Sequence, residues 1–327
     1  MPGSQITSIR PIRAIEGGHV SVVGTGFRSD PPSAVWLDEQ AARVVFASSS
    51  RLTFVVPGEL EGAAVPVRVD DPRGPSVPMA IGAVWATGLH QVDNPVFNAA
   101  GDLFVTYSGS RGQHAPVSIF RVSQAGTREP FASGIVNATS MTFGPDGLLY
   151  VSSRFEGSVY RVADDGTYEQ VATDLGVACG LAFDDDGTMY VGDRSGTVFR
   201  VEDGQATPFA SLPASVAAFH LAMSPTGELF VSAPTLGSYD YVFRIARDGT
   251  VRTVPTPLGR PQGLAFSPDG VLHVVDALAG ASGVYRFPDL EAPPELTATS
   301  GQSMIGLAFG PAGQLVVASN DTAYGFA

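Results

Sequence analysis

A phrase of eight residues returns six times along the chain, and this repeat restricts the possible folds more than any other feature of the sequence. The clearest copies are GLAFSPDG from Gly263, GLAFDDDG from Gly180 and GLAFGPAG from Gly306. Looser copies begin at Asn94, Ser140 and His220. The glycines that close the six copies are 46, 40, 40, 43 and 43 residues apart. Spacings in this range are typical of folds built from repeated structural units.

Each copy is typical of two short strands joined by a tight turn. In the fifth copy, the apolar stretches 264–266 and 271–275 flank the turn residues 267–270. Proline in such a turn presets φ, and the closing glycine tolerates positive φ. A third strand at 283–287, with an aromatic residue beside an arginine, and a fourth at 295–298 follow. Four short strands in about 40 residues predict one blade of a β-propeller, and the lack of a sustained helical period predicts an all-β chain.

Six copies predict six blades, and the last copy lacks one strand. Two strands are expected after Gly313, at 315–318 and 323–326, and the sequence then stops. The segment IGAVWAT, residues 81–87, stands before the first copy where later copies have a fourth strand. We expect this segment to complete the last blade, because closing the ring removes an exposed sheet edge.

The repeat carries a family resemblance over about residues 81–327. The phrase GLAF-x-PDG, followed by Leu-His-Val-Val-Asp and a Val-Tyr-Arg-Phe strand, resembles NHL repeats. It is also similar to the senescence-marker-protein/gluconolactonase propellers. The resemblance implies a six-bladed β-propeller whose ligand site lies at the mouth of the central channel.

The first eighty residues lack the repeat and predict a separate domain. ITSIRPIRAIEGGHVSVVGTGF, residues 6–27, resembles the opening of an IPT/TIG immunoglobulin-like domain. Further short strands are expected at 34–37, 42–46, 52–57 and 65–69, and turn signals every 8–12 residues or so favour a small β-sandwich. Residues 71–78 are the expected linker. We therefore divide the chain into an immunoglobulin-like domain, 1–76, and a propeller, 77–327.

The charge and composition exclude several classes of function. The formal net charge is −13, nearly all of it in the propeller, so a nucleic-acid partner is not expected. All 19 basic residues are arginine, which excludes Schiff-base chemistry by this chain, and the lone Cys179 excludes an internal disulfide. No apolar run of about 18 residues occurs, so no membrane span is expected. The start of the sequence lacks an export signal, which leaves a cytoplasmic protein or an exported one whose signal is absent here.

Two neighbouring rings of residues can face the channel where the inner strands begin. The first ring contains Asp93, Thr139, Cys179, Phe219, Gln262 and Ile305. The second contains Asn94, Ser140, Gly180, His220, Gly263 and Gly306. Which ring points inward depends on a one-residue register that the sequence leaves open.

The gluconolactonase resemblance implies a divalent cation held by a Glu, two Asn and an Asp from four blades. The phrase Asp93-Asn94-Pro95 is similar to the Glu-Gly-Pro-like phrase of that family, with Asp in place of Glu. The other matching positions hold Cys179, Phe219 and Gln262, and neither a thiol nor a phenyl ring suits a hard cation. We therefore expect no cofactor and no tightly held metal.

Polar residues around the channel are the candidates for chemistry or binding. His220 is the group best suited to exchange protons near neutral pH, with Asp93 or Asp276 to orient it. The expected ligand-binding residues are Asn94, Arg154, Asp193, Arg194, Phe219 and Gln262. Structural alternatives stay open: Asp193 and Asp276 can stabilise turns, and His220 can be a satisfied core histidine.

Two functions fit these features. In the first, the propeller is a binding module that presents a pocket to a small-molecule or peptide ligand, with the immunoglobulin-like domain as an accessory. In the second, a lactonase-like hydrolase or lyase uses the same pocket with a modified or absent metal. The incomplete cation ring favours binding, although propellers host both kinds of function.

Overall fold

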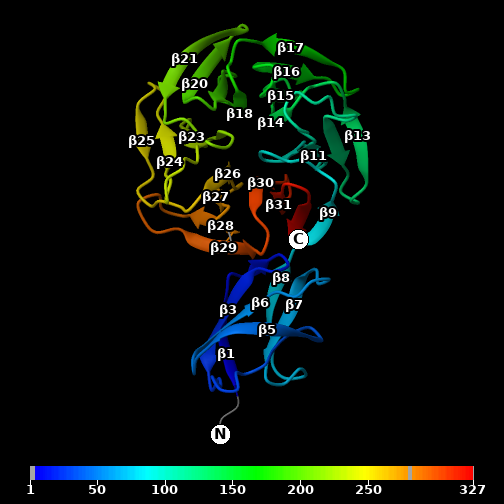
Figure 1. Ribbon diagram of the computed structural model, residues 1–327, viewed down its shortest axis with the longest axis vertical. Coiled ribbons are helices and arrows are strands. Elements are labelled where there is room, and N and C mark those ends of the chain that lie inside the picture. The colour runs from blue at the N-terminus through cyan, green and yellow to red at the C-terminus, as the bar shows by residue number, and fades with distance from the viewer. Residues whose placement is uncertain (1–3, 279–281, 327) are drawn as a thin grey trace.

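The computed structural model describes residues 4–278 and 282–326, and every regular element within them is a β-strand. Figure 1 shows a ring of sheets with a smaller domain, formed by the N-terminal part of the chain, attached at its rim. The expected all-β class, a propeller preceded by an immunoglobulin-like sandwich, is confirmed. Among the described residues, no helix is long and apolar enough to cross a membrane.

The N-terminal domain is a two-layered sandwich. Its strands are β1 (Gln5–Arg10), β2 (Arg13–Ala14), β3 (His19–Thr25), β4 (Val35–Leu37), β5 (Gln40–Ala47), β6 (Arg51–Val55), β7 (Gly62–Val69) and β8 (Val77–Ile81). One layer has the order β1-β3-β6-β5, and β5 leads into the other layer, β4-β7-β8. Alternate residues point into the core between the layers, as Val20 and Val22 do from β3 and Val67 and Val69 from β7.

The ring contains six four-stranded units, which we number as blades along the chain. Blade 1 is β10 (Val96–Phe97), β11 (Leu103–Thr106), β12 (Ile119–Val122) and β13 (Arg128–Ala132). Blade 2 is β14 (Ala138–Phe143), β15 (Leu149–Ser153), β16 (Ser158–Val162) and β17 (Tyr168–Ala172). Blade 3 is β18 (Ala178–Phe183), β19 (Met189–Asp193), β20 (Thr197–Glu202) and β21 (Gln205–Ser211).

The remaining units complete the circle in Figure 1. Blade 4 is β22 (His220–Met223), β23 (Leu229–Ser232), β24 (Val242–Ile245) and β25 (Val251–Thr253). Blade 5 is β26 (Pro261–Phe266), β27 (Leu272–Asp276), β28 (Ser282–Phe287) and β29 (Glu295–Ser300). Blade 6 is β30 (Met304–Phe309), β31 (Leu315–Ser319), β32 (Ala323–Phe326) and β9 (Ala83–Ala86).

The repeated phrase forms the first two strands of each blade and the turn between them. In blade 5, Gly270 has φ 78° and its N–H donates to the carbonyl of Ser267 at 2.8 Å. The arginine of the third strand pairs with an acidic residue of its own blade, as Arg161 does with Glu169 and Arg244 with Glu228. This ion pairing on the blade surface explains why the aromatic-arginine pattern recurs.

Blade 6 takes its outermost strand from the residues that precede blade 1. Strand β9 pairs antiparallel with β32, with Ala86 opposite Ala323 and Ala83 opposite Gly325. The two strands pack closely, because a Cβ atom on Gly325 would lie 2.5 Å from the indole nitrogen of Trp85. This strand lies within the segment 81–87 that the repeat pattern assigned to closure, and it is shorter than that segment.

Blade 5 differs from the expected isolated blade, because it is continuous with the N-terminal domain. Five four-stranded sheets stand alone in the described part of the ring, whereas β26–β29 belong to a twelve-stranded sheet. The connection is the two-residue strand β2, which pairs parallel with β29 on one side and with β8 on the other. Strand β8 also pairs with β7, so residues 77–78, expected in a linker, lie in the N-terminal sandwich.

The buried His273 makes stability sensitive to acid. Its side chain lies in β27, 7% exposed, with its ring edge-to-face against Phe309 at 4.9 Å. Burial, followed by the charges of Arg286 and Arg13, lowers the pKa of His273 below its ordinary value of 6.5. Below about pH 6.5 the unfolded chain therefore binds this proton more readily than the folded one, so folding stability is lost as the pH falls.

We expect wild-type protein to lose more unfolding free energy between about pH 7.5 and about pH 5.5 than the variant His273→Gln, which cannot titrate. Urea denaturation of both proteins at both pH values measures this difference. Equal losses in the two proteins would show that His273 does not contribute to the acid sensitivity.

Candidate functional site

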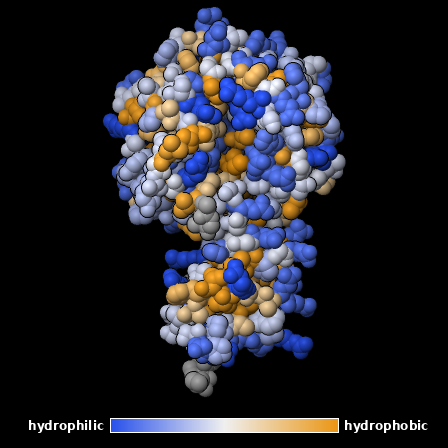
Figure 2. Space-filling model, viewed as in Figure 1, coloured by the Kyte–Doolittle hydropathy of each residue, from blue (hydrophilic) through white to orange (hydrophobic). Residues whose placement is uncertain are grey.

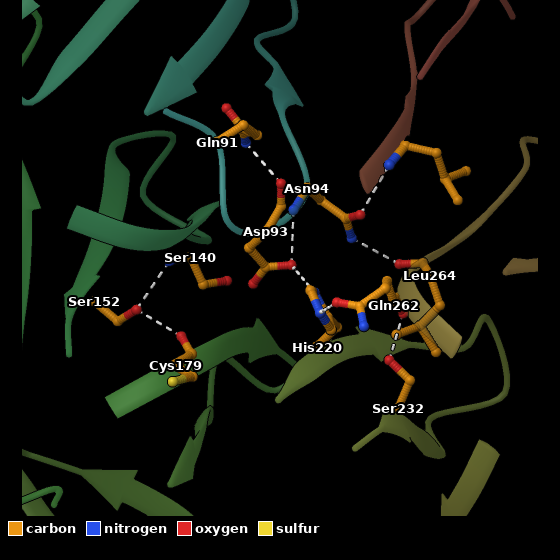
Figure 3. A network of polar contacts seen from close by, with 11 residues as sticks. Gln91, Asp93, Asn94, Ser140, Ser152, Cys179, His220, Ser232, Gln262 and Leu264 are labelled. Carbon is orange, nitrogen blue, oxygen red and sulfur yellow. Dashed lines mark hydrogen bonds and ion pairs between the residues drawn. The ribbon is translucent and has the colours of Figure 1, made fainter. Parts of the chain in front are cut away.

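Three buried polar side chains from different blades meet at the channel, as Figure 3 shows. Asp93 precedes β10, His220 opens β22 and Gln262 lies near the start of β26. The Nδ1 atom of His220 lies 2.5 Å from Oδ1 of Asp93, and its Nε2 atom lies 3.2 Å from Oε1 of Gln262. The exposed fractions are 0% for His220, 1% for Asp93 and 7% for Gln262. Blades 1, 4 and 5 are thus joined by one polar contact chain.

Two hydrogen-bonding patterns satisfy this histidine. With the Gln262 amide oxygen toward the ring, both ring nitrogens face acceptors, which is the pattern of an imidazolium paired with a carboxylate. With the amide turned over, its NH2 group donates to a neutral ring. In both patterns neither nitrogen of His220 is left to act on a substrate.

Asp93 is held by Gln91 and by the backbone of Asn94 as well as by His220. Its Oδ1 atom also accepts from the N–H of Asn94 at 2.7 Å, and its carbonyl accepts from the Gln91 amide at 2.7 Å. Its Oδ2 atom is buried and has no hydrogen-bond partner among the described residues. One carboxylate oxygen is therefore engaged and the other is free of protein contacts of this kind.

Asn94 joins blade 1 to blades 5 and 6. Its Nδ2 atom donates to the carbonyl of Leu264 at 2.8 Å, and its Oδ1 atom accepts from the N–H of Leu307 at 3.0 Å. Serine hydroxyls make similar bridges elsewhere in the ring: Ser232 donates to the carbonyl of Gln262, and Ser152 to that of Cys179 at 2.5 Å. These serines were not expected from the sequence, although both lie at the same place near the end of a second strand.

The two aspartates that end second strands stabilise turns. Asp276 accepts from the backbone N–H groups of Gly259 and Arg260, at 2.9 and 2.6 Å. Asp193 accepts from the N–H of Val177 at 2.9 Å and from the Ser195 hydroxyl. The expectation that Asp276 could orient His220 is wrong, because its carboxylate is held by the loop before β26 and Asp93 takes that place.

Phe219 and Cys179 belong to the hydrophobic core between blades 3 and 4. Phe219 is fully buried among Cys179, Leu229 and Val231, so the expectation that it is a ligand-binding residue is wrong. Burial raises the pKa of the Cys179 thiol to about 12, which keeps it protonated at neutral pH.

The donor set at the channel does not fit a divalent cation. Asp93 Oδ1 and Gln262 Oε1 are both engaged with His220, and Cys179 and Phe219 offer no oxygen. Within the described residues, no group of three or more His, Cys, Asp or Glu side chains could hold a metal ion. Because calcium takes about 6–8 oxygen ligands, the absence of a tightly held cation stays a prediction supported by this chemistry.

A cavity of about 410 Å³ occupies the channel between the polar network and the turns of the repeat. Its walls come from the later residues of the inner strands, such as Met141, Leu221 and Phe266. Asn94 is the expected site residue that lines it. Figure 2 shows a hollow near the centre of the ring, bordered by both hydrophilic and hydrophobic residues.

Three arginines from adjacent blades gather near the other end of the channel, and we call them the mouth arginines. Arg111 lies in the loop after β11, Arg154 follows β15 and Arg194 follows β19. Burial lowers the pKa of Arg154, and the charges of Arg194 and Arg111 lower it further. Arg154 and Arg194 were expected ligand-binding residues, whereas Arg111 was missed because its loop is longer than the corresponding loops of the other blades.

The loop that carries Arg111 is built around Asn137. The Asn137 amide donates to the carbonyls of Ser108 and Ser110, and its Oδ1 atom accepts from the N–H of Gly112 at 2.7 Å. Arg154 reaches the same loop, with Nη2 3.4 Å from the carbonyl of Gly109. Because Asn137 is 1% exposed, the loop rests on a rigid support.

Comparison with known proteins supports the two-domain architecture. Residues 4–78 match the IPT/TIG domain family. No curated protein sequence matches the chain. A solved structure of an auxiliary nutrient binding protein from Bacteroides ovatus is 13% identical, with a TM-score of 0.56, and the match covers 98% of this chain and 97% of that one.

Two other solved structures resemble the ring. A proposed gluconolactonase is 17% identical, with a TM-score of 0.60, and the match covers 75% of this chain and 90% of that one. The second is a catalytically inactive histidine-to-alanine variant of virginiamycin B lyase from Staphylococcus aureus, with quinupristin. It is 14% identical, with a TM-score of 0.51, and the match covers 75% of this chain and 97% of that one. At these identities the likeness shows the fold alone. The chain therefore combines an N-terminal domain that matches the IPT/TIG family with a β-propeller.

Proposed function

We propose that this protein is a binding module in which the mouth arginines Arg111, Arg154 and Arg194 hold the anionic group of a small-molecule ligand. The ring acts as an NHL- or gluconolactonase-like six-bladed propeller that presents the site, and the N-terminal domain is an accessory. The observation that carries the proposal is the half-buried Arg154, which has no acidic partner among the described residues.

Arg154 differs in this respect from the arginines on the blade surfaces. Five of those pair with acids in their own blades: Arg121 with Glu129, Arg161 with Glu169, Arg200 with Glu202, Arg244 with Glu228 and Arg286 with Glu295. Arg154 is close to two further arginines, and among the described residues its side chain makes one hydrogen bond, to the Gly109 carbonyl. Its surroundings therefore provide positive charge without a compensating carboxylate.

An anionic ligand would supply the missing partner. A partly buried charge without a counter-charge is costly, and like charges nearby add to that cost. A carboxylate fits the planar guanidinium group in a two-pronged geometry, and such charge-assisted hydrogen bonds are the stronger ones. The site is also shaped in advance, because Asn137 fixes the loop of Arg111 before any ligand arrives.

Catalysis by His220 is the less favoured alternative. A hydrolase or lyase would need an accessible proton-transfer group, but His220 is fully buried and both ring nitrogens are in contact with protein groups. Two fold neighbours are described as a gluconolactonase and a lyase, so the enzymatic alternative should be tested as well.

Gluconate and glucitol form a matched pair of probes, because they differ in one terminal carboxylate. We expect gluconate to bind more tightly than glucitol, and we expect Arg154→Gln to weaken gluconate binding about 10- to 100-fold. Arg43→Gln is the control, since Arg43 is an exposed arginine of β5 in the N-terminal domain. Isothermal titration calorimetry measures the four affinities, at low ionic strength because salt screens exposed charges.

Equal affinity for gluconate and glucitol, or full binding by Arg154→Gln, would rule out the proposed site. Hydrolysis of glucono-δ-lactone above its spontaneous rate, abolished by His220→Ala in a protein that still folds, would instead support the enzymatic alternative.

A further inference from the structure

A cleft of about 850 Å³ lies between the N-terminal domain and the ring, away from the channel. One wall comes from the end of β1 and the residues that lead into β2. The other comes from the repeat turns and strand ends of blades 5 and 6, together with the start of β29. Figure 2 shows that the molecule narrows where the two domains meet. Ligand pockets are commonly about 300–1,000 Å³ and often form at such domain boundaries.

The N-terminal wall offers one cation and an apolar surface. Strand β2 is wedged between β8 and β29, with Arg13 opposite Ala298 and Ala14 opposite Thr299. Because successive strand residues point to opposite sides, Ala14 is buried in the core while Arg13 lines the cleft. Ile12, which is 56% exposed, extends the apolar part of this wall.

The propeller wall adds a second cation beside an aromatic surface. Arg286 of β28 pairs with His273 of β27 across the sheet, and the His273 ring packs edge-to-face against Phe309. Arg13, His273 and Arg286 all line the cleft. Leu296 and Pro268 complete the apolar lining on this side.

The residues that line the cleft carry more positive than negative charge, which favours anionic ligands, although the chain as a whole is acidic. Three arginines line it, Arg10, Arg13 and Arg286, against the acids Asp269 and Glu295. Asp269 already accepts from the Ser267 hydroxyl at 2.5 Å, and Glu295 pairs with Arg286 at 3.5 Å. Arg13 has no ion-pair partner among the residues that the structure describes.

We propose that this cleft is a second ligand site, which takes a small amphipathic carboxylate. Its carboxylate lies between Arg13 and Arg286, and its apolar body packs on Ile12, Leu296 and Phe309. A ligand in this place touches both domains, so it tightens their junction beside β2. The site is independent of the mouth arginines, which lie in loops at the opposite ends of the blades from the repeat turns.

The probes are 4-phenylbutyrate and 4-phenylbutan-1-ol, which share an apolar body and differ in charge. We expect the full chain to bind the acid about 10-fold or more tightly than the alcohol, because charge-assisted hydrogen bonds are about twice as strong as neutral ones. Arg13→Gln should weaken binding of the acid at least about 10-fold and leave the alcohol little changed. Arg43→Gln, which removes an arginine that does not line the cleft, should bind the acid as wild type does. Calorimetry measures each affinity, with urea denaturation to verify that Arg13→Gln is folded.

Preference for the acid together with its loss in Arg13→Gln supports the cleft site. Equal affinities for acid and alcohol, no binding of the acid at millimolar concentration, or unchanged binding in Arg13→Gln each overturn it. Loss of 4-phenylbutyrate binding in Arg154→Gln but not in Arg13→Gln would place the probe at the mouth arginines and would also overturn the proposal. If Arg13→Gln fails to fold, a double change of Ile12→Asp and Leu296→Asp on the apolar walls should abolish binding, and retained binding overturns the proposal.

Discussion

Aspartate in place of Ala86 should destabilise the ring by about 3–5 kcal/mol, whereas aspartate in place of Val84 in the same strand should cost less than about 1 kcal/mol. Both residues lie in β9, the strand that completes blade 6. The side chain of Ala86 is 5% exposed and packs with Leu89, Val316 and Ala323. Val84 is 54% exposed.

The difference follows from where the new carboxylate would lie. At residue 86 it would be buried between blades 1 and 6 without a partner, and an uncompensated buried charge is among the costliest substitutions. At residue 84 it would point to solvent, and only the low strand propensity of aspartate would count. Both variants keep the N-terminal domain and all six repeat phrases. A deletion of residues 1–87 would be a weaker test, because it removes the N-terminal domain together with β9.

Urea denaturation of the wild type and both variants measures the two costs. A loss in Ala86→Asp no larger than that in Val84→Asp would mean that β9 does not contribute to the stability of the ring. Blade 6 would then hold together without this strand. A large loss in both would instead contradict the exposed position of Val84.

The repeat spacing was sufficient to predict the ring, because each turn has its own local signal. A closing glycine marks all six turns, Pro or Asp stands two residues before it in five of them, and apolar runs on both sides set the first two strands. The merger of blade 5 with the N-terminal domain was not predictable in this way. Strand β2 has only two residues, Arg13 and Ala14, which is too short for any periodicity to be visible.

The boundary between the domains shows how a shared apolar pattern misleads. Residues 81–87 read as one strand, but Ile81 ends β8 and packs in the core of the N-terminal sandwich. The closing strand begins two residues later, at Ala83. Both strands are apolar and nearly contiguous, so the break between them is decided by tertiary packing rather than by local sequence.

The sequence was sufficient to predict which residues lie near the channel, but not which of them contact one another. Asp93 and Gln262 come from the first ring of positions and His220 from the second, and yet they contact one another. Register shifts interrupt the first strands of blades 2, 3, 5 and 6, whereas β22, which begins at His220, pairs with β23 without one. A bulge of this kind re-aims side chains by one position, and no residue of the repeat phrase signals it.

The pair formed by Asp93 and His220 is the second place where a single substitution should have a large effect. Asp93→Ala should lower the free energy of unfolding by about 3–5 kcal/mol, because it leaves a fully buried imidazole without its carboxylate. Asp93→Asn should cost less, since its amide oxygen still accepts a hydrogen bond in the place of Oδ1.

A double-mutant cycle separates the pairing of these residues from their individual packing. The double variant Asp93→Ala, His220→Ala should lose clearly less unfolding free energy than the sum of the losses in the two single variants. Each single change leaves a buried polar partner without its contact, whereas the double change removes both partners. Urea denaturation of the four proteins gives the coupling free energy, which we expect to be in the range of about 1–3 kcal/mol. Additive costs would mean that the 2.5 Å contact contributes no net stability. His220 would then be held by its contact with Gln262 and by the packing around it, without a contribution from Asp93.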